Sequence, residues 1–358
     1  MRLSRLSLVV AFLFATLSLG AQDTHFTLHN YAPLWLNPAN TGGFLGSIRV
    51  GGVYRGQWYS LNGIRTPTAY ADAPLAFGLR KQDWVGVGFS LVHDSAGEFD
   101  LNQTFFGFSG AYHLSLDKRR TNVITLGVQY GSTTYGVKMP TRTPDQQRIF
   151  DQEIGGLGES QGEEFGELDI PGMNRGGSNN NYNDLNAGLK LRMLLDKETG
   201  NTLEAGVSVL HLNSARRRSL IQRDTLPGVS EDVRKRRPTI HAHARYDMEL
   251  SEKWRFQPTA FFQSSAGTSS VSLQAWGARK LKNNLDMRMG VGYRTGDAAK
   301  VMFGFDTDRL RGALAYDITL SQARNVNSYQ GAFELGLAYV FNIYKKPEVT
   351  PTILCPRL

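Results

Sequence analysis

The chain has 358 residues and a formal net charge of +8, with 41% hydrophobic residues, 38 glycines and a single cysteine. This apolar fraction is too high for a disordered chain, and one cysteine excludes both a disulfide framework and a metal cluster built on cysteines. A mean hydropathy of −0.31 excludes a polytopic helical membrane protein. It does not exclude a membrane β-barrel, in which polar inward residues offset apolar outward ones.

The chain begins with a segment that has the features of a secretory signal peptide. Arg2 and Arg5 precede an apolar run at residues 6–19, and the small residues Gly20 and Ala21 follow it. A membrane-spanning helix needs about 20 apolar residues, so this run fits an export signal better than an anchor. We therefore expect residues 1–21 to be a signal peptide that is cleaved near Gln22. No later run approaches about 18 uninterrupted apolar residues, so strands must cross any membrane that the protein enters.

The rest of the chain alternates between apolar and polar residues with a period of two. In residues 240–250 every even position is apolar and every odd position is His, Arg, Asp or Glu. An extended strand puts alternate residues on opposite faces, so one face of this segment is apolar and the other is polar. The pattern recurs in about 14 segments of roughly 10 residues, the length that a tilted strand needs to cross a bilayer. Aromatic residues gather at segment ends, as in interfacial girdles, at Tyr54, Trp58, Tyr112, Tyr130, Trp254, Tyr293 and Tyr339.

These features predict an all-β fold, a transmembrane antiparallel β-barrel of about 14 strands, which spans residues 46–343 and follows a cleaved signal peptide. A soluble β-sandwich also alternates, but the segment lengths, the aromatic ends and the small residues on the polar faces favour the barrel. We expect residues 22–45 to form a periplasmic or lumenal segment. Residues 344–358 are expected to form a Pro-rich periplasmic tail that contains Cys355.

The lengths of the connections support the barrel independently. Long connections follow the fifth and seventh segments, at 137–181 and 213–238, whereas the connections after even-numbered segments are short. An even antiparallel barrel places short periplasmic turns on one rim and long outer loops on the other. The alternation therefore predicts that both termini lie on the periplasmic rim.

The two long connections differ in charge. Residues 137–181 are rich in Asp and Glu but lack the ligand spacing of an EF-hand, so a solvated surface loop is a better interpretation than a calcium site. Residues 213–238 contain two basic runs, at 216–218 and 234–237. These runs could attract acidic groups, either the phosphate-bearing sugars of the outer leaflet or the acidic loop nearby. Alternatively, they serve only to keep the loop soluble.

Candidate catalytic, metal and cofactor sites are weak in this sequence. His241 and His243 share a strand face, but no third ligand at a defined spacing accompanies them, which favours a histidine pair in a polar lumen over a metal site. No P-loop, dinucleotide fingerprint or nucleophile elbow is present. We therefore expect no enzymatic activity, no catalytic residue, no metal and no cofactor.

Blocks of sequence near both ends carry a resemblance. QDTHF occurs at residues 22–26, YAPLWLNPANTG at 31–42, YRGQW at 54–58, TAYADAPL at 68–75 and FELGLAY at 333–339. In this order they resemble the PorP/SprF family, outer-membrane proteins of the type IX secretion system in Bacteroidetes. The resemblance singles out eight residues with a structural or partner-binding role, namely Asn37, Pro38, Tyr54, Arg55, Gln57, Trp58, Asp72 and Pro74.

The resemblance implies a non-enzymatic outer-membrane component of the type IX secretion and gliding machinery, which aids the secretion or surface attachment of cargo proteins such as adhesins. Implied partners are ring or peptidoglycan-linked periplasmic components, C-terminal domains of secreted cargo, and outer-membrane lipid, with no nucleic acid. The alternative is an outer-membrane transport channel for small or hydrophobic solutes. Because residues 22–45 are long enough to enter the lumen, and Tyr, Phe and Arg side chains fill part of it, we expect no wide water channel.

Overall fold

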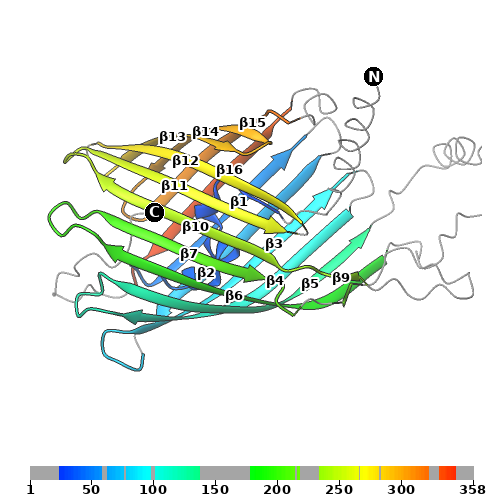
Figure 1. Ribbon diagram of the computed structural model, residues 1–358, viewed down its shortest axis with the longest axis horizontal. Helices are drawn as coiled ribbons and strands as arrows, with labels where there is room; N and C mark the ends of the chain where they lie inside the picture. Colours follow the sequence, from blue (N-terminus) through cyan, green and yellow to red (C-terminus); the bar gives the residue numbers. More distant parts are fainter. Residues whose placement is uncertain are drawn as a thin grey trace, which may run out of the picture.

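The strands close into a single barrel. The computed structural model describes residues 24–58, 63–75, 78–97, 101–137, 178–213, 216–217, 234–265, 267–281, 284–321 and 330–343. In these residues 14 antiparallel strands form a closed barrel, each next to its neighbour in the chain (Figure 1). The strands are β1 (Ile48–Gln57), β2 (Ile64–Leu75), β3 (Trp84–Ala96), β4 (Leu101–Ser115), β5 (Val123–Val137), β6 (Ser178–Leu194), β7 (Thr202–Leu210), β10 (Thr239–Glu249), β11 (Trp254–Ser265), β12 (Thr268–Lys280), β13 (Asp286–Arg294), β14 (Ala298–Asp306), β15 (Leu310–Thr319) and β16 (Ala332–Phe341). The predicted fold class is confirmed. The predicted signal peptide lies outside the described residues.

The first and last strands form the seam that closes the barrel. β1 pairs with β16 from Ile48 opposite Phe341 to Gln57 opposite Ala332. This pairing leaves neither strand with a free edge, as membrane barrels require, because lipid offers no partner to backbone groups.

Connections of different length lie on opposite rims. The connections after β2, β4, β6, β10, β12 and β14 form one rim, here called the short-turn rim, and the longest of them covers residues 76–83. The other rim, here called the long-loop rim, carries the connections at 138–177 and 211–238. The predicted positions of the two long connections and of the short even-strand turns are confirmed, but the alternation is not general, because the connections after β3, β11 and β13 on the long-loop rim are also short.

The two faces of the barrel wall differ as the period-two pattern predicts. On β5, the outward residues Leu126, Val128 and Tyr130 are 52–59% exposed, whereas the inward residues Thr125 and Gln129 are 1% exposed. Other exposed outward residues include Phe108, Leu273, Met289, Val301, Tyr316 and Leu337. An apolar belt on the outside of a closed barrel is the surface that a bilayer covers.

In the described part of the chain, helices are few and short. They are η1 (His29–Tyr31), α2 (Pro33–Leu36) and η2 (Pro38–Asn40), and these precede the first strand. Among the described residues no helix is long and apolar enough to span a membrane.

Part of the basic connection after β7 is described. Its two basic runs form a two-stranded antiparallel pair, β8 (Arg216–Arg217) with β9 (Arg234–Lys235). The acidic loop predicted at 137–181 lies mostly outside the described residues, as does the tail at 344–358 with Cys355. Their predicted roles stay predictions.

Candidate functional site

The lumen of the barrel contains a folded piece of the same chain. Residues 24–47, here called the lumenal segment, lie inside the ring of strands, where Figure 1 draws them in dark blue. Thr27, Leu34, Asn37, Ala39 and Thr41 are each 0% exposed. A segment of this kind has no core of its own, so its burial comes from the barrel wall.

Prolines and an asparagine cap shape the lumenal segment into short helical turns. Pro33 and Pro38 start α2 and η2, where a missing N–H costs nothing because the first N–H groups of a helix have no intrahelical partner. The side chain of Asn37 accepts a hydrogen bond from the Ala39 N–H at 2.9 Å and so caps η2. The sequence block around residues 31–42 therefore encodes a compact, bent backbone.

The lumenal segment runs from one rim to the other. At the short-turn rim the Ser47 N–H donates to the Phe341 carbonyl at 2.8 Å. At the far end, His25 Nε2 lies 4.0 Å from the carboxylate of Asp297, in the connection between β13 and β14 on the long-loop rim. The prediction that both termini lie on one rim thus holds for the ends of the first and last strands, whereas the described residues before β1 lead to the other rim at His25. The pattern of strands defines where β1 starts but carries no information about the path of the preceding residues.

The N-terminal end of the segment is held by a carboxylate of the last strand. Glu334 accepts the Thr27 N–H at 2.7 Å and the Leu28 N–H at 2.6 Å, one on each carboxylate oxygen. Gln274 donates to the Thr27 carbonyl at 2.8 Å, and the Thr27 hydroxyl donates to Asp317 at 2.6 Å. We call Glu334, Asp317 and Gln274 the upper anchor. Three of these four hydrogen bonds involve main-chain groups and one involves the Thr27 hydroxyl, so the upper anchor recognises a backbone shape more than a side chain.

Cations of the wall neutralise the carboxylates of the upper anchor. Arg55 on β1 forms ion pairs with Glu334 and, at 3.1 Å, with Asp317. Arg294 pairs with Asp317 as well, and all four side chains are at most 5% exposed. Removing one member of such a buried cluster is costly, because it leaves an uncompensated charge.

The middle of the segment is bonded to the backbone of β6 and β7. Asn37 Nδ2 donates to the carbonyls of Leu189 and Val207, each at 3.2 Å. Ser208 donates its hydroxyl to the Leu36 carbonyl at 2.7 Å. A Cβ at Gly188 would stand 1.9 Å from Asn37 Oδ1, so the wall needs glycine at this point of close approach.

The end of the segment near the short-turn rim is held by a second carboxylate. Asp72 on β2 accepts the Gly42 N–H at 2.7 Å, and Trp84 Nε1 donates to the Gly42 carbonyl at 3.0 Å. His113 Nε2 lies 2.8 Å from the Thr41 carbonyl oxygen. We call Asp72, Trp84 and His113 the lower anchor. Gly42 has φ +66°, a left-handed conformation that suits glycine.

The structure brings most of the residues singled out by the resemblance to the lumenal segment. Asn37 and Pro38 belong to the segment, Asp72 belongs to the lower anchor, and Arg55 pairs with Glu334 and Asp317 of the upper anchor. Gln57 Oε1 accepts a hydrogen bond from Arg55 at 3.2 Å. Pro74 lies beside Gly42, because a Cβ built on Gly42 would be 3.3 Å from the Cα of Pro74.

Tyr54 and Trp58 are not part of this arrangement. The Tyr54 side chain is 37% exposed on the outer face of β1. Trp58 follows β1 with φ 55°. Sequence reasoning missed Glu334, Asp317 and Gln274. The sequence carried weak signals for them: each stands at an inward position of a late strand, and Glu334 lies in the block FELGLAY at 333–339.

The histidine pair lies on the inner face of β10, as predicted. His241 Nδ1 is 3.2 Å from the Leu36 carbonyl oxygen. On the same face Arg245 pairs with Glu204 at 2.7 Å and with Asp247 at 3.3 Å. Among the described residues, no group of three or more His, Cys, Asp or Glu side chains is placed to hold a metal ion.

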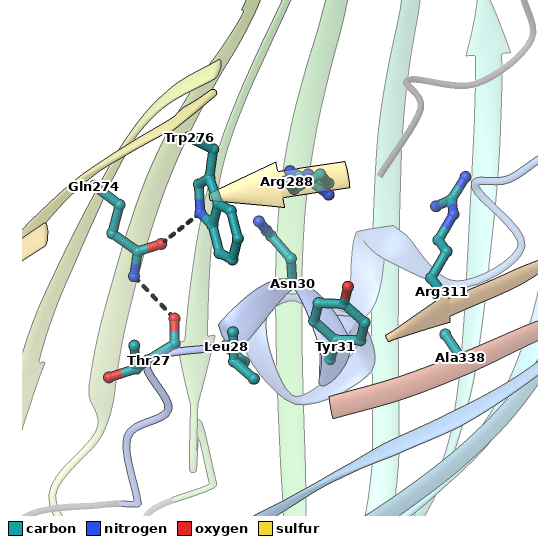
Figure 2. A pocket seen from close by; sticks show the side chains of 9 residues that line it. All are labelled: Thr27, Leu28, Asn30, Tyr31, Gln274, Trp276, Arg288, Arg311 and Ala338. Atoms are coloured by element: carbon teal, nitrogen blue, oxygen red, sulfur yellow. Dashed lines mark hydrogen bonds between the residues drawn. The ribbon is translucent and has the colours of Figure 1, made fainter. Parts of the chain in front are cut away.

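Small cavities remain between the segment and the wall, among them one beside Thr27 and one beside Asn40. Figure 2 shows the first, in which Gln274 bridges the Thr27 carbonyl and the indole N–H of Trp276. The cavities leave about 10 Å³ and about 30 Å³ for water-sized molecules, enough for roughly one or two waters. The first is lined by Thr27, Leu28, Asn30, Tyr31, Gln274, Trp276, Arg288, Arg311 and Ala338. The lumen thus holds a polypeptide, residues 24–47 of its own chain.

Comparison with known proteins gives one family. The model of the family described as "Type IX secretion system membrane protein PorP/SprF" matches residues 18–339. No curated protein matches the chain.

Several solved structures are similar in fold. One is described as "CymD monoaromatic hydrocarbon channel", with 11% identity and a TM-score of 0.47, covering 88% of this chain and 94% of that one. The toluene transporter TodX of Pseudomonas putida has 12% identity and a TM-score of 0.45, covering 90% and 95%. A FadL homologue of Pseudomonas aeruginosa has 11% identity and a TM-score of 0.44, covering 86% and 93%.

Proposed function

Because the chain belongs to the PorP/SprF family of type IX secretion system membrane proteins, we propose that it is a non-enzymatic outer-membrane component of that secretion and gliding machinery. In this role it aids the secretion or surface attachment of cargo proteins such as adhesins. It acts by holding other proteins at its rims, and its lumen is not the path of the cargo.

The observation that carries this proposal is the occupied lumen. The lumenal segment is bonded to the wall at both ends and in the middle, by Glu334, Asn37 and Asp72 among others. A barrel that fills itself in this way is suited to a scaffold, whose exposed parts are the two rims and the lipid-facing belt. In an outer-membrane barrel the short turns face the periplasm and the long loops face outward. We therefore assign ring or peptidoglycan-linked components to the short-turn rim and cargo C-terminal domains to the long-loop rim.

The experiment is affinity purification of the tagged full-length protein from envelopes, together with a deletion strain. We expect periplasmic ring components and a surface protein to co-purify, and the deletion strain to lose that surface protein while small-solute uptake stays unchanged. Loss of solute uptake with intact secretion would instead identify a transport channel. A channel role requires that the lumenal segment leave the lumen or rearrange within it, since its central residues are fully buried against the wall.

A further inference from the structure

The lumenal segment follows a one-way path through the barrel. Gly42 is bonded at Asp72, close to the short-turn end of β2. Asn37 is bonded midway along β6 and β7, at Leu189 and Val207. Thr27 is bonded at Glu334, close to the long-loop end of β16. These three contacts are in the order of the chain, so the segment rises through the lumen and does not fold back as a hairpin.

The segment ends at the level of the long-loop rim. Beyond the upper anchor, His25 lies 4.0 Å from Asp297 in the β13–β14 connection. Thr24 and His25 are partly exposed, whereas residues 26–29 are buried. The residues that connect the segment to β1 lie at the opposite rim, where Leu45 is 49% exposed.

From this path we infer that the protein threads its own barrel and presents the N-terminal end of the lumenal segment, at Thr24, on the outer surface of the cell. The end thereby becomes part of the surface that extracellular proteins meet, next to the connections of the long-loop rim. Periplasmic components can reach only the other end of the segment, around Leu45. The assignment of the long-loop rim to the outside rests on the proposed outer-membrane function, whereas the threading itself rests on the contacts alone.

The upper anchor is what keeps the end in place. Two main-chain N–H groups donate to one carboxylate, and hydrogen bonds to a charged partner are among the stronger ones in proteins. Because Glu334 and Asp317 also pair with Arg55, release of the end would disturb a buried ion-pair cluster. The N-terminal end is therefore a fixed part of the rim.

Cysteine labelling in whole cells tests the inference. In a Cys355→Ser background, Thr24→Cys is compared with Ser269→Cys at the long-loop rim and Lys118→Cys at the short-turn rim, both exposed positions. A membrane-impermeant maleimide should label Thr24→Cys and Ser269→Cys to about the same extent in intact cells. Lys118→Cys should react only after the outer membrane is permeabilised. The proposed exposure of Thr24 at the cell surface is overturned if Thr24→Cys, like Lys118→Cys, is labelled only after the outer membrane is permeabilised.

A crosslinking test separates the threading from the membrane orientation. His25→Cys with Asp297→Cys should be joined within one molecule by a bis-maleimide that spans about 10 Å, seen as a shift in gel mobility, because the native side chains lie 4.0 Å apart. A spacer is used because a direct disulfide requires Cβ atoms only about 3.5–4.5 Å apart. Lys118→Cys with Asp297→Cys is the matched pair and should not crosslink. A crosslinked His25–Asp297 pair together with a reversed labelling pattern would keep the threading and overturn the proposed orientation. Absence of the crosslink in folded, heat-modifiable protein overturns the threading.

Discussion

Arg49 on β1 and Asp72 on β2 form a bidentate ion pair inside the barrel, with Nε and Nη2 of the guanidinium 2.9 and 2.8 Å from the two carboxylate oxygens. Both side chains are at most 2% exposed. The same carboxylate accepts the Gly42 N–H at 2.7 Å. One acidic side chain thus joins two neighbouring strands to the lumenal segment, and this double role makes it a good point for a test.

Asp72→Asn should destabilise the folded barrel. The change removes the carboxylate charge that faces the buried Arg49 guanidinium, and breaking one partner of a buried ion pair costs about 3 kcal/mol or more. The measurement is the urea midpoint of the heat-modifiable band in detergent. Asp308→Asn, in the exposed turn before β15, is the matched control and should leave the midpoint in place. Equal midpoints for the two variants would contradict the assigned role of Asp72.

Glu334→Gln should loosen the N-terminal end of the segment while the barrel remains closed. A hydrogen bond to a charged group contributes about 1.5–3 kcal/mol, so amide hydrogen exchange in residues 24–31 should become roughly tenfold faster or more. Exchange in residues 37–42, which the middle contacts and lower anchor hold, should change less. Glu252→Gln, on the exposed turn after β10, is the control. Unchanged exchange at Thr27 and Leu28 would rule out the upper anchor.

Gly127→Ala should push the segment away from the wall. A Cβ at Gly127 would lie 2.3 Å from the Ala39 nitrogen, a main-chain contact that no side-chain rotation relieves, and overpacking of this kind costs about 1–3 kcal/mol. We expect current in planar bilayers from the variant and no steady large conductance from the wild type. Gly110→Ala, whose nearest contact would be at 4.0 Å, should behave as wild type. A wild-type protein with large steady conductance would overturn the filled lumen.

Acid should weaken the short-turn rim through Asp83. Hydrogen bonds from Arg80, and further ones from Tyr112 and the Ser115 N–H, lower the pKa of Asp83 from its usual 3.8 to about 2. Because the folded pKa is lower than the unfolded one, the ionised carboxylate stabilises the fold above pH 3.8, and this contribution is lost as the pH falls towards 2. A plot of the urea midpoint against pH should be flatter over this window in Asp83→Asn than in wild type. An identical slope in both proteins would count against this interpretation.

A charge on the lipid-facing belt should destabilise the folded barrel more in the middle of a strand than at its end. Val128→Arg on β5 places a guanidinium on a surface that is 52% exposed, where it should cost about 2–4 kcal/mol in lipid vesicles. Leu116→Arg, directly after β4 at the short-turn rim, should cost roughly 0–1 kcal/mol. Folding titrations in vesicles measure both. Equal costs would contradict the membrane position of β5.

The alternation of residue types was enough to predict the barrel wall. On β10 the sequence put Ile240 outside and His241 inside, and these residues are 47% and 2% exposed. Such a pattern is local, because every strand needs one face for lipid and one for the lumen. The rims followed from connection lengths, which are equally local.

The site was only half predictable. The resemblance pointed to Asn37, which bonds the lumenal segment to the wall, to Asp72 of the lower anchor, and to Arg55, which pairs with the upper anchor. Their partners were not predictable, because Thr27 and Glu334 are 307 positions apart and no local pattern connects them. The direction of the segment was equally hidden, since its sequence shows that it is bent and apolar but not which rim its first residue reaches.

The position of the upper anchor constrains the order of assembly. Glu334 and Asp317 belong to β16 and β15, the last strands to be synthesised, while the residues they bind come at the start of the chain. Until β16 pairs with β1, both are edge strands whose unpaired backbone groups can pair with other chains. A truncated chain that lacks β15 and β16 would expose the β1 edge and would also lose the hydrogen bonds of Glu334 and Asp317 to Thr27. Filling the interior and closing the wall are therefore two aspects of one cooperative step in biogenesis.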